Sequence, residues 1–269
     1  MAEIALHYDH RPTETPLVLL PPFPLDARFY RDVQDLLRDL PVVVVDPPGF
    51  GASPDPVALA HALGEPEEPA LETYARGIAE ALGTLGVERI VLAGVSIGGY
   101  SAMAFAELFP SRLAGIGLLD TAGEADGEEK IADRTTMAES VERGTPPGVL
   151  LTPTIPNMVS EVTMNQREDL VVRLEPWYAD APAAGVSWSQ RAMAARPERL
   201  SVLRSLDIPA LVVRGEDDAV SSADSASAMA EALETEVVEI PEAGHLAAIE
   251  DPQAVARALR DLWERAVRE

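Results

Sequence analysis

A serine flanked by glycines is the clearest candidate for chemistry in this sequence. Ser96 lies in the segment GVSIG (residues 94–98), after the apolar run Ile90–Ala93 and at the start of a helical pattern, Ile97–Phe109. A sharp turn between a strand and a helix needs small residues two positions before and after the serine, and glycine is present at both. Such a turn holds the hydroxyl at the sheet edge, where the helix N-terminus favours a developing oxyanion. We therefore predict that Ser96 is a nucleophile in acyl transfer.

One of the four histidines is placed to activate this serine, because a serine hydroxyl is a weak nucleophile that needs a base. His7 and His10 lie in a short N-terminal strand region, and His61 lies in an acidic loop. His245 follows the last predicted strand and precedes the last predicted helix. In a parallel sheet that loop opens on the same edge as the serine turn. Elimination and placement both favour His245 as the base.

A carboxylate must hold such a histidine in the correct tautomer and stabilise the imidazolium. Asp217 and Asp218 follow the predicted strand Leu211–Val213, which gives the chain order serine, acid, histidine. Neighbouring aspartates point in different directions, so only one of them can serve. Asp120, at the end of the run Ile116–Leu119, is a rival at an equivalent position. The residues alone leave all three aspartates open.

Short apolar runs that end at Pro, Gly or Asp alternate with helical patterns along most of the chain. Runs that are apolar on both faces are typical of buried parallel strands. The predicted strands are Leu17–Leu20, Val42–Val45, Ile90–Ala93, Ile116–Leu119, Leu211–Val213 and Glu236–Ile240. The predicted helices are Arg28–Leu40, Leu71–Leu85, Ile97–Phe109, Ala223–Leu233 and Pro252–Val267. This alternation predicts an α/β fold with a mostly parallel, doubly wound sheet.

The alternation stops between residues 121 and 206, where short helical patterns are broken by turns and no strand is evident. We predict a helical cap there, inserted between two strands of a core formed by residues 1–120 and 207–269. A cap over the carboxyl edge of the sheet would help to form the substrate pocket. The predicted pocket residues are Trp177, Trp188, Met137 and Met158. The loop Ala52–Pro69, rich in proline and acidic residues, is expected to be an exposed connection.

Composition narrows the class of protein. The chain has 269 residues, 47% of them apolar, and a formal net charge of −24. Such a charge repels phosphate backbones and anionic lipids, so neither nucleic acid nor a membrane is expected as a partner, and highly anionic substrates such as acyl-CoA are mildly disfavoured. The absence of cysteine excludes disulfides, thiolate nucleophiles and cysteine metal sites. With no signal peptide or membrane span in the sequence, we expect a cytoplasmic protein.

Taken together, these motifs make the chain resemble the α/β-hydrolase superfamily in its capped, cofactor-free form. The motifs are LVLLPPFPLDARFY (residues 17–30), DPPGFGAS (46–53), GVSIGGYSA (94–102), VVRGEDD (212–218) and AGHLAAIEDP (243–252). The resemblance implies that Asp218 is the acid, since the G-x-x-D pattern of the family starts at Gly215. It also implies an oxyanion hole formed by the backbone N–H groups of Phe23 and Ile97, with no metal or cofactor.

One motif departs from the family. The family usually has His-Gly before the oxyanion residue, and this chain has Pro21-Pro22. Proline lacks an N–H and has a fixed φ, so we expect a different loop shape, with a cis peptide before Pro21 or Pro22. A single strand, residues 3–8, precedes the first parallel strand, and we therefore expect seven strands.

A serine nucleophile favours acyl transfer over the aspartate chemistry of some relatives. We predict an esterase that cleaves a small, largely apolar carboxylic ester. The resemblance leaves alternatives open on the same catalytic residues: a perhydrolase, a lactonase, a thioesterase, an amidase or a carbon–carbon bond hydrolase. A non-enzymatic ligand-binding receptor is the alternative from another class.

Overall fold

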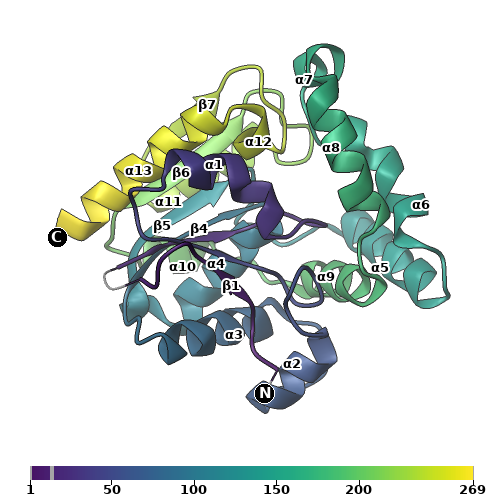
Figure 1. Ribbon diagram of the computed structural model, residues 1–269, viewed down its shortest axis with the longest axis horizontal. Helices are drawn as coiled ribbons and strands as arrows, with labels where there is room; N and C mark the ends of the chain where they lie inside the picture. Colours follow the sequence, from purple (N-terminus) through teal and green to yellow (C-terminus); the bar gives the residue numbers. More distant parts are fainter. Residues whose placement is uncertain (1, 13–14, 269) are drawn as a thin grey trace.

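Seven strands form one sheet in the part of the chain that the structure, a computed structural model, describes (residues 2–12 and 15–268; Figure 1). Met1, Thr13, Glu14 and Glu269, which fall within the predicted core ranges, lie outside the described residues. The order across the sheet is β1-β3-β2-β4-β5-β6-β7. The strands are β1 (Leu6–His7), β2 (Leu17–Leu20), β3 (Val42–Val45), β4 (Ile90–Val95), β5 (Leu113–Leu119), β6 (Ala210–Gly215) and β7 (Val237–Ile240).

The sheet is parallel except for β1, which pairs antiparallel with β3. The predicted α/β class and the seven strands are therefore confirmed. The register aligns the carboxyl ends of β4, β5 and β6, because the Ser96 N–H donates to Leu119 O and the Asp120 N–H to Val213 O, each at 3.0 Å. Residues that follow these three strands consequently meet at one edge of the sheet.

Helices cover both faces of the sheet, because each central strand is apolar on both sides. One face is covered by η1 (Ala27–Tyr30), α1 (Arg31–Leu36), α12 (Ala247–Glu250) and α13 (Pro252–Arg268). On the other side lie α3 (Leu71–Thr84), α4 (Ile97–Leu108), α10 (Leu200–Arg204) and α11 (Ala223–Ala232). Figure 1 shows α1 and α13 on the opposite side of the sheet from α3 and α4. A short 3₁₀ helix, η2 (Pro110–Arg112), joins α4 to β5.

Most residues of the segment Ala52–Pro69, predicted to be an exposed loop, are exposed, but the segment contains a helix, α2 (Pro56–Leu63), so the prediction of a loop was wrong. The Asp55 carboxylate accepts a hydrogen bond from the Val57 N–H at 2.9 Å, and Gly64 in the left-handed conformation ends the helix. These are strong start and stop signals, and Leu59 is buried beneath them. The acidic residues on either side of α2 concealed an eight-residue helix, PVALAHAL, that is apolar at every position except His61.

Residues 121–206 contain helices and no strand, and most of these helices lie to one side of the sheet in Figure 1. They are α5 (Glu128–Glu142), α6 (Pro147–Leu151), η3 (Thr152–Asn157), α7 (Glu161–Gln166), α8 (Glu168–Ala179), α9 (Ala183–Ala195) and α10. Helix α5 packs against α9 over much of its length, whereas α10 packs against α4 and α11. The last helix of the predicted cap range thus lies against the body of the sheet. None of the helices in the described ranges is both long and apolar enough to span a bilayer.

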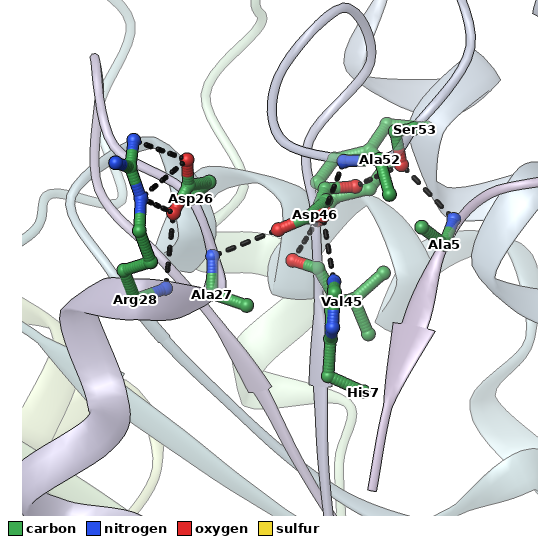
Figure 2. Close-up of polar contacts among 10 residues, drawn as sticks. Ala5, His7, Asp26, Ala27, Arg28, Val45, Asp46, Ala52 and Ser53 are labelled. Atoms are coloured by element: carbon green, nitrogen blue, oxygen red, sulfur yellow. Dashed lines mark hydrogen bonds and ion pairs between the residues drawn. The ribbon is translucent and has the colours of Figure 1, made fainter. Parts of the chain in front are cut away.

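Asp46, which follows β3, links three segments beside the sheet edge (Figure 2). Its buried carboxylate accepts hydrogen bonds from the Ala27 N–H at 2.8 Å and the Ala52 N–H at 2.8 Å, and it contacts His7 Nε2 at 2.7 Å. Ser53 extends the network, since its hydroxyl donates to Asp46 O and accepts from the Ala5 N–H. The loop after β2 is therefore held to β1 and to the loop after β3.

Candidate active site

Ser96 lies between β4 and α4 in a strained backbone conformation, with φ 54° and ψ −117°. A positive φ is costly for a non-glycine residue and persists only where the surroundings impose it. The turn is closely packed: a Cβ on Gly94 would overlap the backbone of Gly98, and a Cβ on Gly98 would overlap the backbone of Leu20. The Thr121 hydroxyl also donates to Ser96 O at 2.8 Å. Close packing and the hydrogen bond from Thr121 therefore hold the turn in place.

His245 and Asp218 lie in direct contact although they come from different loops. His245 Nδ1 is 3.0 Å from one carboxylate oxygen of Asp218 and 3.1 Å from the other, and both side chains are buried. Burial raises the pKa of the Asp218 carboxyl, but the hydrogen bond to His245, its charge and the N–H groups of Ser221 and Val220 together hold this pKa below its usual value. Asp218 is thus a carboxylate in contact with Nδ1 of the imidazole, and the other ring nitrogen, Nε2, lies outside this contact.

The two rival aspartates are placed differently. Asp217 is exposed and contributes its N–H to Ala243 O. Asp120 is buried at the end of β5, and its Oδ1 accepts from the Gly215 N–H at 2.7 Å. Burial and the nearby Asp218 charge raise the pKa of Asp120 well above its usual value. Of the three aspartates, Asp218 alone is in hydrogen-bond contact with His245 in this structure.

Ser96 and His245 line one cavity of about 180 Å³. Phe23 lines it too, and Ile97 is the first residue of α4. The N–H groups of the first helical turn have no partner within the helix, and the Phe23 N–H makes no hydrogen bond to any residue in the described ranges. These two N–H groups are the ones predicted to form an oxyanion hole.

The loop that carries Phe23 contains a cis peptide bond, as expected, but at a different proline. The cis peptide bond lies between Phe23 and Pro24, so the expectation of a cis bond before Pro21 or Pro22 was wrong. The Leu25 N–H donates to Pro22 O at 2.8 Å and closes a four-residue turn around it. Three prolines occur in this short loop, and the sequence did not show which of them is cis.

Two of the four predicted pocket residues line the cavity and two do not. Met137 and Met158 line it, whereas Trp177 and Trp188 are absent from its walls. Trp188 is a buried residue of the main apolar core. Trp177 lies between Arg28 and Arg173, whose guanidinium carbons are 5.3 and 5.6 Å from its ring centroid, beside another hollow of the surface. The two tryptophans, expected from composition alone to face the substrate, therefore pack elsewhere.

Other lining residues were missed from the sequence. Most of the wall is apolar, but Lys130 and Arg134 also line the cavity, four residues apart on α5. Two cations at this helical spacing share one helix face, and that spacing is the signal that could have found them. The remaining wall residues are Pro24, Tyr100, Leu151, Thr154, Tyr178, Gln190, Met193 and Val220.

The other histidines serve different contacts. His7 pairs with Asp46, and His61 Nε2 is 2.6 Å from Glu67 on the exposed α2 side of the molecule. Within residues 2–12 and 15–268, no three His, Cys, Asp or Glu side chains gather closely enough to hold a metal ion. The chemistry available at the cavity is that of a serine, a histidine held by a carboxylate, and backbone N–H donors.

Comparison with known proteins gives consistent matches over nearly the whole chain. A sequence model of the protein family described as "Alpha/beta hydrolase family" matches residues 17–258 of this chain. A thermophilic esterase from Thermogutta terrifontis, of known structure, superposes with a TM-score of 0.88 at 33% identity, covering 98% of this chain and 94% of that one. A 2-succinyl-6-hydroxy-2,4-cyclohexadiene-1-carboxylate synthase from Enterobacter sp. (strain 638) is 29% identical, over 91% of this chain and 90% of its own. A 3-oxoadipate enol-lactonase from Acinetobacter baylyi is 26% identical, over 70% of this chain and 68% of its own.

Proposed function

This chain belongs to the alpha/beta hydrolase family, and we propose that it is a serine esterase that cleaves a small, largely apolar carboxylic ester. The observation that carries the proposal is the shared cavity: Ser96 and His245 line it together, and His245 Nδ1 is 3.0 Å from Asp218. A cavity of about 180 Å³ is smaller than a pocket for a drug-sized ligand. That volume favours an ester of few atoms.

The proposed reaction proceeds in two acyl transfers. Ser96 Oγ attacks the ester carbonyl while His245 Nε2 takes the hydroxyl proton, and the oxyanion accepts hydrogen bonds from the Phe23 and Ile97 N–H groups. The tetrahedral intermediate expels the alcohol, to which His245 returns the proton, and an acyl-serine remains. Water, activated by His245, then releases the carboxylic acid. Asp218 stabilises the imidazolium in both halves.

We further propose that residues 121–206, the helical segment between β5 and β6, act as a cap that sets substrate choice. Lining residues from α5 (Met137), α6 (Leu151), η3 (Thr154), α8 (Tyr178) and α9 (Met193) support this role. Leu151 and Met193 present apolar surface to the space beside Ser96. Methionine adapts its shape more readily than branched side chains do, which suits a pocket that accepts variable acyl groups.

A lactone is the second candidate substrate, because a lactone is a cyclic ester and the same steps would open it. Its support is the similarity to a 3-oxoadipate enol-lactonase over 70% of the chain. In that case the leaving alcohol stays attached to the acyl group.

Turnover of p-nitrophenyl butyrate tests the proposal. The wild type should hydrolyse it, and Ser96→Ala should lower kcat on the order of 10⁴-fold or more while the circular dichroism spectrum is unchanged. A fluorophosphonate should add to Ser96 in the wild type. Labelling at a different serine, or binding of the ester without turnover in the folded wild type, would exclude this mechanism, and the second result would indicate a receptor.

A further inference from the structure

The cavity beside Ser96 has cationic side chains and no anionic side chain on its wall. Lys130 and Arg134 both line it, and no Asp or Glu is among the described residues that do. Lys130 is the only lysine in a chain whose net charge is −24. A local excess of positive charge at the catalytic cavity therefore contrasts with the rest of the molecule.

Three cations share one carboxylate behind this wall. Asp126 is the carboxylate nearest to both cations, with Arg134 Nε at 2.6 Å and Lys130 Nζ at 3.8 Å. The same carboxylate also receives Arg196, whose two terminal nitrogens contact its two oxygens at 2.6 and 2.9 Å. One carboxylate thus faces three cations. The ion pairs within 4 Å beside this wall therefore contain more positive than negative charge.

Both cations that line the cavity have donors without a hydrogen-bond partner in the described part of the chain. Arg134 Nε bonds Asp126, and Nη1 contacts Gln190 Oε1 at 3.4 Å and Met193 Sδ at 3.2 Å. Its Nη2 has no hydrogen-bond partner in the described part of the chain, and no hydrogen bond is formed by Lys130 Nζ there either. Burial and the neighbouring Arg134 charge lower the pKa of Lys130. An anion bound here would relieve the cost of holding these charges together.

We propose that the ester hydrolysed at Ser96 carries a carboxylate, bound between Lys130 Nζ and Arg134 Nη2. This proposal rests on the proposed esterase function and narrows its substrate to a small ester that is apolar except for one carboxylate. Two available donors match the two oxygens of a carboxylate, and the apolar remainder of the wall accommodates the short chain that joins the carboxylate to the ester. The net negative charge of the protein would disfavour larger polyanions at the same site.

Matched pairs of esters test the proposal, because each pair differs only in charge. Monoethyl succinate is compared with ethyl 4-oxopentanoate, in which a methyl ketone replaces the carboxylate on the acyl side. Carboxymethyl butanoate is compared with 2-oxopropyl butanoate, which places the same change on the alcohol side. The ratio of kcat/KM for the charged and neutral esters is the measured quantity. In the wild type this ratio should favour the charged ester in at least one pair.

Lys130→Gln and Arg134→Gln should each lower this ratio by about tenfold or more, the size expected for a lost hydrogen bond to a charged group. The kcat/KM of the neutral ester should change much less. Lys130→Arg should restore most of the ratio, because it keeps the charge. Arg143→Gln is the matched control. Arg143 caps the C-terminal end of α5 and pairs with Glu139 at the surface, so this substitution removes one positive charge from the same helix outside the cavity. Unchanged ratios in both test variants, for both pairs, would overturn the proposal.

A second measurement does not depend on turnover. Trinitrobenzenesulfonate modifies free amines, and a chain with one lysine gives one internal site that peptide mapping identifies. Succinate should slow the modification of Lys130, whereas neutral succinamide should not. If the wild type hydrolyses neither pair yet succinate protects Lys130, the esterase proposal fails and the carboxylate site stands. In another outcome the neutral esters are hydrolysed well, the kcat/KM ratios are unchanged in Lys130→Gln and Arg134→Gln, and succinate does not protect Lys130. The proposal of a carboxylate site is then wrong, and the esterase proposal is supported.

Discussion

Asp120 Oδ1 accepts a hydrogen bond from the Gly215 N–H at 2.7 Å, and this contact fastens the end of β5 to the end of β6. The other oxygen of Asp120 has no partner in the described part of the chain. Asp120 and Asp218 follow neighbouring strands, yet burial raises the pKa of Asp120, whereas the contact with His245 keeps the pKa of Asp218 low. Because their pKa values are shifted in opposite directions, we expect pH and substitution to have different effects at the two aspartates.

Replacing Asp120 by asparagine should make the stability of the protein less sensitive to a rise in pH above the ordinary carboxyl range. A carboxyl with a raised folded-state pKa binds a proton more tightly in the folded than in the unfolded chain, so the fold loses stability as pH rises from the unfolded value through the folded value. Asp120→Asn keeps an acceptor for the Gly215 N–H and removes this titration. In thermal melts from pH 5 to pH 9, the melting temperature of the variant should rise relative to that of the wild type as pH rises. A constant difference across this range would contradict the assignment.

Asp218→Asn should lower kcat by on the order of 10²–10⁴ through loss of the correct histidine tautomer. Asp120→Asn is the matched control, because it makes the same chemical change at the same sheet edge and should keep most of the activity. The assay is p-nitrophenyl butyrate hydrolysis at neutral pH, with folding checked by circular dichroism. An active Asp218→Asn beside an inactive Asp120→Asn would transfer the role of the acid to β5.

Much of the architecture could be predicted because several strands are apolar on both faces. Leu17–Leu20 and Val42–Val45 were predicted with the bounds they have in the structure, since a proline directly precedes each run. Ser96 and the candidate partners Asp218 and His245 could be named because parallel topology brings the loops after the strands to one edge. The residues alone left three aspartates open, because the aspartate that contacts the imidazole depends on the path of the loop after β6. The G-x-x-D pattern of the family singled out Asp218.

The walls of the cavity were harder to predict, because a helix turns its side chains through 100° per residue and its tertiary orientation decides which of them face the site. Trp188 packs into the core from α9, while Met193, five residues later on the same helix, lines the cavity. Helix α5 is highly charged, with few buried residues, so Lys130 and Arg134 resemble members of a solvated face. Their spacing places Lys130 and Arg134 on one face of α5, and the position of α5 beside Ser96 makes that face part of the cavity wall.

Trp188→Ala should cost stability on the order of 3–5 kcal/mol, because a large buried side chain leaves a cavity in the core. Its effect on the preference among p-nitrophenyl esters of different chain length should be small. Met158→Ala should do the reverse and shift the preference toward longer acyl groups, since Met158 lines the space beside Ser96. Melting temperature and a chain-length series, measured on both variants, separate the two effects. A changed chain-length profile in Trp188→Ala alone would contradict this division.

Asp46→Asn should destabilise the protein by about 1–3 kcal/mol, the cost of leaving buried polar groups unpaired. The Asp46 carboxylate receives two N–H groups and a histidine nitrogen (Figure 2), and an asparagine NH₂ would face at least one of these donors with another donor. His7→Ala, which removes one contact of a half-exposed side chain, should cost less. Urea unfolding measures both values. Equal costs would indicate that the His7 contact dominates the network.

The helical segment leaves the sheet after β5 and returns at β6, and these two strands are neighbours, with Leu119 paired to Val213. Its two ends are therefore anchored one strand apart, whatever lies between them. Doubling the length of such an excursion costs only about 0.6 kcal/mol in closure entropy. Over evolutionary time, insertion, deletion or recombination could remodel this segment while the sheet keeps its register. The catalytic edge would then acquire new substrates through exchange of a single continuous stretch of sequence.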